Sequence, residues 1–263
     1  MDASLRFDHA ILAVNDLRQA QADFESLGFT VFYGGQHANG LTENCLMVFQ
    51  DGSYLELIGQ VRRPEPPAPD ESDSLRRIFD PGEGWAGYAL LSRDLVHDST
   101  SMQQRGLYIV GPMENSRLRP DGERVAWRAA ILDAEMMPFF LEDVTPRRLR
   151  VPDDERGIHP NGVTGVVRIV IAGEALAPMT VLYRTILGQT ETPSTLEMPG
   201  IHAVDFTLPG TTITLVSPLG EHPELAAHLE RRSPCIYAIY LAGGLGRAFE
   251  ISRTHAGLLY AVR

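Results

Sequence analysis

Cysteine is almost absent from this chain of 263 residues, which contains only Cys45 and Cys235. The two residues lie far apart and belong to no Cys-x-x-Cys or Cys-His pattern. A disulfide framework and a structural zinc site are therefore not indicated. We expect both cysteines to be small residues of a hydrophobic core.

Long apolar runs are also missing. No segment approaches the roughly 20 consecutive apolar residues that a membrane-spanning helix needs. The first ten residues, MDASLRFDHA, have neither a basic leader nor an apolar stretch that would act as a secretion signal. We therefore expect a cytoplasmic protein without a membrane partner.

Basic residues are outnumbered, with 23 Lys and Arg against 34 Asp and Glu and a formal net charge of −11. Such a charge repels nucleic-acid phosphates, so we do not expect nucleic acid as a partner. Arg147, Arg148 and Arg150 form the one basic cluster. Because Asp153, Asp154 and Glu155 follow it directly, we interpret this stretch as a solvated linker.

The pattern of apolar and turn residues predicts an element order that recurs along the chain: one strand, one helix and three strands (βαβββ). In the first module the strands are expected at 7–14, 29–33, 44–50 and 53–58, with a helix from Asp16 to Gly28. In the second they are expected at 85–92, 107–110, 124–132 and 138–144, with a helix at 94–106. In the third they are expected at 166–171, 201–208 and 211–217, with a helix ending at Gly188. A fourth, shorter pass has strands at 235–241 and 258–262 and a helix from about 245.

Two stretches of different composition divide these modules. Four prolines fall within 61–73, so residues 61–82 are predicted to link modules 1–60 and 83–146. The charged residues 147–162 link this pair, 1–146, to a second, incomplete and degenerate pair at 163–263. We predict an α+β fold of paired βαβββ modules forming curved mixed sheets, with strand edges that a second copy in a homodimer could cover.

The alternation of side chains in the first module brings chemistry to one face. His9 and Ile11 share a face of the first strand, and Tyr54, Glu56 and Ile58 share a face of the fourth. Imidazole and carboxylate bind divalent metals, so His9 and Glu56 are candidate ligands. A hydrogen-bonded pair in a metal-free cavity is the alternative.

Three further residues have two interpretations each. His37 follows Gly34-Gly35 and is either a ligand or general base, or a surface turn residue. Arg128 either binds a substrate carboxylate or pairs with a glutamate. Tyr54 is either a cavity wall or a hydrogen-bond donor.

Several short phrases resemble the glyoxalase-like branch of the vicinal-oxygen-chelate superfamily over about residues 1–190. They are Phe7-Asp8-His9, Gly34-Gly35-Gln36-His37 with Thr42 and Asn44, Asp51 to Ile58, Ala126-Trp127-Arg128, and Pro138 to Glu142. The resemblance implies paired βαβββ units that form a cup, with a divalent ion such as Zn, Ni, Mn or Fe held inside.

The family's second histidine is missing here. Aligning Asp16-Leu17 with Asp94-Leu95 places Gly87 opposite His9. Glu142 aligns with Glu56, and it is expected to face inward with Phe140, whereas Asp143 is not. The resemblance then implies His9, Glu56 and Glu142 as the metal ligands. The corresponding third-module residues, Arg168 and Thr214, offer no metal site.

These residues lead to three functional hypotheses. The first is a metal-dependent isomerase or lyase for a small oxygenated substrate that carries a carbonyl or carboxylate. Catalysis would use Glu56, His37 and Glu142, and substrate binding would use Arg128, Tyr54 and Asn44. The second is a metal-free protein that sequesters a small molecule. The third, an iron-dependent dioxygenase, is less favoured because Gly87 supplies no histidine.

Overall fold

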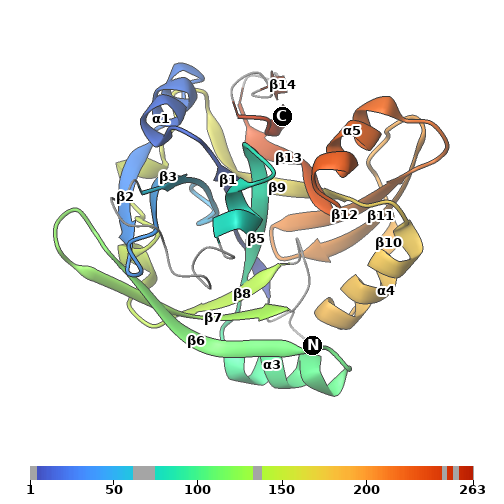
Figure 1. Cartoon of the computed structure of the whole chain (residues 1–263), viewed down its shortest axis with the longest axis horizontal. Helices are drawn as coiled ribbons and strands as arrows, with labels where there is room; N and C mark the ends of the chain where they lie inside the picture. Colours follow the sequence, from blue (N-terminus) through green and yellow to red (C-terminus); the bar gives the residue numbers. More distant parts are fainter. Residues whose placement is uncertain (1–4, 62–74, 133–137, 245–247, 251–254, 263) are drawn as a thin grey trace.

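The structure is a computed structural model that describes residues 5–61, 75–132, 138–244 and 255–262, together with the backbone of 248–250. Its strands form a closed eight-stranded barrel and a separate seven-stranded sheet, shown side by side in Figure 1. This arrangement confirms the predicted α+β fold with curved mixed sheets. None of the helices in these residues is long and apolar enough to cross a membrane.

The barrel combines the strands of the first two modules in the order β1-β4-β3-β2-β6-β7-β8-β5. The first module supplies β1 (Arg6–Ala13), α1 (Leu17–Ser26), β2 (Phe32–His37), β3 (Thr42–Val48) and β4 (Tyr54–Gln60). The second supplies β5 (Gly84–Leu91), α3 (Leu95–Gln104), β6 (Ile109–Leu118), β7 (Arg124–Leu132) and β8 (Phe139–Asp143).

Both helices begin where the sequence provides an aspartate cap. The Asp16 carboxylate accepts from the Arg18 and Gln19 N–H groups, and Asp94 accepts from the His97 N–H. Leu17 and Phe24 of α1 are buried against the outer face of the barrel. The helices therefore cover the outside, and the interior is left to the other strand face.

The remaining strands form the second sheet in the order β10-β11-β12-β9-β13-β15-β14. Their bounds are β9 (Val163–Ala172), β10 (Thr192–Pro193), β11 (Ile201–Leu208), β12 (Thr211–Pro218), β13 (Cys235–Gly243), β14 (Ala248–Glu250) and β15 (Leu258–Val262). Its helices are α4 (Leu176–Leu187) and α5 (Pro223–Arg231).

The barrel and the second sheet share one hydrophobic core. The largest apolar cluster joins Tyr88 and Phe140 of the barrel to Ile169 and Tyr183 of the second half. Within it the hydroxyl groups of Tyr88 and Tyr183 form a 2.6 Å hydrogen bond. Both cysteines are buried and free, as expected.

Several local predictions differ from the structure. The strand predicted at 29–33 is β2 at Phe32–His37. Helix α5 was not predicted, and Ala248–Glu250 form a strand paired with β15 where a helix from about 245 was expected. The rest of that segment, and most of the proline-rich linker, lie outside the described residues. Strand β6 continues to Leu118 instead of ending at 110, because a register shift between Val110 and Met113 accommodates Pro112.

Candidate functional site

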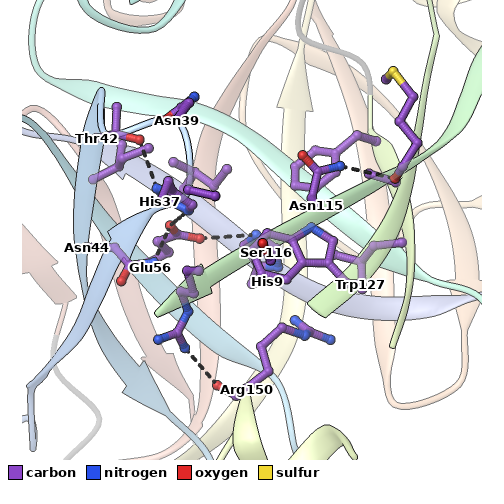
Figure 2. A pocket seen from close by; sticks show the side chains of 18 of the residues that line it. His9, His37, Asn39, Thr42, Asn44, Glu56, Asn115, Ser116, Trp127 and Arg150 are labelled. Atoms are coloured by element: carbon purple, nitrogen blue, oxygen red, sulfur yellow. Dashed lines mark hydrogen bonds and ion pairs between the residues drawn. The ribbon is translucent and has the colours of Figure 1, made fainter. Parts of the chain in front are cut away.

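The barrel encloses a cavity of about 630 Å³ whose two walls differ in chemistry (Figure 2). The first module and the end of β6 supply a polar wall that includes His9, His37, Thr42, Asn44, Glu56 and Arg117. Strands β7 and β8 supply an apolar wall that includes Trp127, Ala129, Ile131, Phe139 and Leu141. The cavity therefore suits a small molecule with a polar end and an apolar body.

The register of β1 and β4 brings the two main candidates together. The strands run parallel, with His9 opposite Tyr54 and Ile11 opposite Glu56. All four side chains line the cavity, while Leu55 and Leu57 pack into the core behind. The predicted inward face of both strands is confirmed.

The carboxylate of Glu56 lies between two imidazoles, as Figure 2 shows. Its Oε2 is 3.4 Å from Nε2 of His9, and its Oε1 is 3.8 Å from Nε2 of His37. Glu56 is only 5% exposed. His37 is therefore a cavity residue that faces Glu56, and the surface-turn interpretation does not apply.

Hydrogen bonds hold the outer atoms of this group. Asn44 Nδ2 donates to Glu56 Oε1 at 2.8 Å, and His37 Nδ1 lies 2.8 Å from the Thr42 hydroxyl. Asn44 depends in turn on Gly34, since a Cβ there would come within 2.4 Å of Asn44 Oδ1. Gly34 therefore makes room for the side chain that orients Glu56.

His9 is oriented from behind by Asp8. Asp8 Oδ2 lies 2.7 Å from Nδ1 of His9, and Arg150 donates to both carboxylate oxygens. Burial alone would raise the pKa of Asp8, but Arg150, His9 and Arg147 hold it well below its usual range. Because the anionic Asp8 can only accept, Nδ1 carries the hydrogen and Nε2 is turned toward Glu56.

Tyr54 completes the wall behind His9. Its ring stacks on the imidazole with centroids 4.4 Å apart, and its hydroxyl accepts from Arg150 Nη1 at 3.0 Å. Burial raises the pKa of this hydroxyl above its usual value. Tyr54 is therefore a buried, neutral member of the cavity wall.

The interpretation of Arg147, Arg148 and Arg150 as a solvated linker is wrong for two of them. Arg150 is 3% exposed and binds Asp8 and Asp143, and Arg147 binds the same two carboxylates. A buried carboxylate needs a cation beside it, and this segment supplies two. The segment between the two halves therefore braces the site.

The predicted inward face of β8 is wrong by one residue. Phe139 and Leu141 line the cavity, whereas Phe140 packs into the core. Glu142 accepts from the Leu95 N–H at 3.2 Å and from Arg128 at 3.0 Å. A shift of one position exchanges the two faces of a strand, so Glu142 does not join His9 and Glu56.

The corrected face also decides the placement of two other residues. Arg128 pairs with Glu142 outside the cavity, which is the ion-pair alternative considered for it. Asp143 was predicted not to share the inward face. In the structure it binds Arg150, and Arg150 lines the cavity. Neither Arg128 nor Glu142 lines the cavity.

In the described strands, neither the second nor the third module repeats the His9 and Glu56 pair. In β5 and β8, Ala89 stands opposite Phe139, which matches Ile11 opposite Glu56. Gly87 and Phe139 therefore occupy the places of His9 and Glu56 in the second module. In the second sheet these places are held by Arg168 and Thr214, both bonded to Asp205.

His9 and Glu56 are spaced as two ligands of one divalent ion would be. Two ligands on a tetrahedral zinc ion lie about 3.3 Å apart, close to the 3.4 Å between His9 and Glu56. Asp8 and Asn44 supply the outer hydrogen bonds that such ligands usually have. Among the described residues no group of three or more His, Cys, Asp or Glu side chains forms a metal site, so the predicted three-ligand set is not assembled.

Arg117 and Phe139 are among the cavity residues that were not predicted from the sequence. Arg117 lies on the part of β6 beyond the predicted strand end, so its inward direction had no signal. Phe139 belongs to an apolar run, Phe139-Phe140-Leu141, in which alternation cannot be recognised. The turn Asp51-Gly52, by contrast, marks the start of β4 and so fixes its register.

Solved structures show the same fold at low sequence identity. A hypothetical protein from Staphylococcus aureus matches with a TM-score of 0.72 and 14% identity, covering 98% of this chain and 100% of that one. A mutant of 4-hydroxymandelate synthase from Streptomyces coelicolor matches with a TM-score of 0.64 and 13% identity, covering 92% and 71%. A xylose isomerase-like TIM barrel/4-hydroxyphenylpyruvate dioxygenase fusion protein matches at 0.52 and 14%, covering 90% and 36%.

Sequence comparison assigns the family. No curated protein matches the chain. The profile of the family described as "Glyoxalase-like domain" matches residues 7–187, which include the whole barrel and the start of the second half. The chain therefore belongs to the glyoxalase-like domain family.

Proposed function

We propose that the barrel cavity is the active site of an isomerase or lyase that moves a proton on a small oxygenated substrate bearing a carbonyl or carboxylate. The observation that carries the proposal is the position of Glu56. Its carboxylate is nearly buried, borders the cavity and faces His9 on one side and His37 on the other. A base with these neighbours is suited to proton transfer.

The two oxygens of Glu56 have different surroundings. Oε2 faces His9, and Oε1 faces His37 and is held by Asn44. Glu56 takes the proton from a carbon next to the substrate carbonyl, and His37 is placed to pass that proton on. Asn44 and Asp8 keep the carboxylate and the His9 ring in position during the transfer.

The family implies a divalent ion, and its place in this chain is next to His9 Nε2 and Glu56 Oε2. When bound, such an ion polarises the substrate oxygens and makes the neighbouring C–H more acidic. The orientation of the His9 ring favours this ligand role, because the contact of Asp8 with Nδ1 leaves Nε2 of His9 facing Glu56.

A metal-free binding protein is the second candidate. The observation that favours it is the absence of a three-residue metal group in the described chain. The cavity would then bind and sequester a small molecule without changing it. In that case Glu56 and His37 would serve as hydrogen-bond partners only.

Solvent exchange of substrate protons separates these candidates. Pyruvate, phenylpyruvate and hydroxyacetone are incubated with the protein in D₂O, and loss of the proton next to the carbonyl is followed by NMR, with the metal content of the same sample measured. We expect exchange above the buffer rate, and a reduction of about 10²-fold or more in Glu56→Gln. Exchange at the buffer rate with all three compounds would refute the enzyme proposal. Exchange by a sample that contains no metal would refute the proposed need for a metal ion.

A further inference from the structure

We propose that Arg117 binds the carboxylate of a ligand whose apolar body packs against Trp127 and Phe139. The inference rests on the proposed function, since it concerns the substrate of the same cavity. It narrows that substrate to an organic anion with an apolar aromatic or aliphatic body.

The direction of Arg117 follows from strand pairing. In the antiparallel pair of β2 and β6, Arg117 stands directly opposite His37. Opposed residues of an antiparallel pair place their side chains on the same face. Since His37 lines the cavity, Arg117 does so too, together with Asn115 two positions earlier.

The charge of Arg117 lacks a carboxylate partner among the described residues. Arg117 is 4% exposed, and its hydrogen bonds go to two backbone carbonyl oxygens, those of Gly34 and Arg150. Burial lowers its pKa, and the nearby Glu56 opposes that effect without coming into ion-pair distance. A buried cation without a counter-ion is costly, so such a residue is kept for a reason other than stability.

The neighbouring arginines do not share this property. Arg150 is paired with Asp8 and Asp143, Arg128 with Glu142, and Arg119 with Asp121. Among the described residues, each of these three cations has a carboxylate partner and Arg117 has none. A ligand carboxylate in the cavity would supply the missing charge.

The chemistry of the guanidinium matches this ligand. It carries five N–H donors in a planar fork, and the two carbonyl contacts leave donors free to pair with both oxygens of a carboxylate. On the adjacent strand β7 and the next strand β8, four residues present carbon surface to the same cavity: Trp127, Ile131, Phe139 and Leu141. A ligand that satisfies both walls has an anionic end and an apolar body.

Arg117 also borders an outer pocket of about 260 Å³, lined by Arg119 and Arg156 among others. These two arginines are already paired, with Asp121 and Asp154. Arg150 also lines this pocket and is paired with Asp8 and Asp143. Among the described residues that line it, Arg117 is therefore the one cation without a carboxylate partner. Arg119→Gln is a suitable control, because it alters the outer pocket and leaves the barrel cavity intact.

The test is a binding titration followed by tryptophan fluorescence, since one of the two tryptophans, Trp127, lies on the cavity wall. The probes are phenylacetate and hexanoate, with phenylacetamide and hexanamide as neutral counterparts. We expect the wild type and Arg119→Gln to bind at least one carboxylate 10-fold or more tightly than its amide. We expect Arg117→Gln to lose that preference, and Arg117→Lys, which keeps the charge without the fork, to retain only part of it.

Two results would overturn the proposal: neither carboxylate binds the wild type more tightly than its amide, or folded Arg117→Gln keeps the full preference. If Arg117→Gln does not fold, Arg117→Lys decides, and an undiminished preference in that variant refutes the bidentate contact. Failure of the proposed function is distinguishable from both. A carboxylate preference without any proton exchange would refute the enzyme and leave the Arg117 site standing, whereas exchange without the preference would do the reverse.

Discussion

Replacement of Asp8 tests the buried charge cluster that supports His9. Asp8 is fully buried and binds His9, Arg147 and Arg150. Removing one partner from a buried ion pair costs about 3–5 kcal/mol. Because Asp143 still faces both arginines in Asp8→Asn, we expect the lower end, about 3 kcal/mol.

The assay is urea unfolding of the wild type and Asp8→Asn at neutral pH. A loss of about 3 kcal/mol corresponds to a fall of about 6–12 °C in Tm for a chain of this size. The matched control is Asp154→Asn, which breaks an exposed pair with Arg156 and should cost less than about 1 kcal/mol. If Asp8→Asn costs no more than this control, with unchanged m values, the cluster is not the brace described here.

Three other substitutions test separate parts of the structure. Gly34→Ala should displace Asn44 from Glu56 and lower proton exchange more than 10-fold. The control Gly87→Ala, whose Cβ meets open space, should leave exchange unchanged. Equal activities of the two variants would contradict the role of Gly34. Tyr88→Phe leaves the Tyr183 hydroxyl without its partner and should cost about 1–3 kcal/mol in urea unfolding, while the double variant with Tyr183→Phe should recover part of that loss. Burial would raise the pKa of Asp205, but bonds from Thr214, Ser194 and the Thr195 N–H, with Arg168, hold it below its usual value. The stability that Asp205 adds is therefore complete above the unfolded pKa of about 3.9 and is lost as the pH falls through the lower folded pKa. In acid unfolding, the difference in the free energy of unfolding between the wild type and Asp205→Asn should therefore shrink below about pH 4, and growth of that difference would contradict this.

The residues that could be placed from the sequence are those in strands with clear alternation. His9 lies in an alternating strand that ends at a capped helix, and Glu56 follows the turn Asp51-Gly52. Both signals fix which side chains face the helix and which face the interior. The inward pair was therefore predictable without the structure.

The residues that could not be placed lie where the local pattern is uninformative. In Phe139-Phe140-Leu141 every side chain is apolar, so the sequence does not decide which of them faces the helix. Because Phe140 was predicted to face inward, Glu142, two positions later, was predicted to belong to the site. Arg117 lies beyond Gly111-Pro112, which is a usual strand end, and its continuation is seen only in the pairing of β6 with β7 and β2.

We propose that the chemistry of this chain takes place at Glu56 inside the barrel. The most direct test compares proton exchange in Glu56→Gln and Glu142→Gln. The two substitutions are chemically identical, but one is inside the barrel and the other is on its outer face. Glu142 binds Arg128 and the start of α3 outside the cavity. We predict that Glu56→Gln loses exchange by about 10²-fold or more while Glu142→Gln keeps it, and equal loss in both, or loss only in Glu142→Gln, would contradict this account.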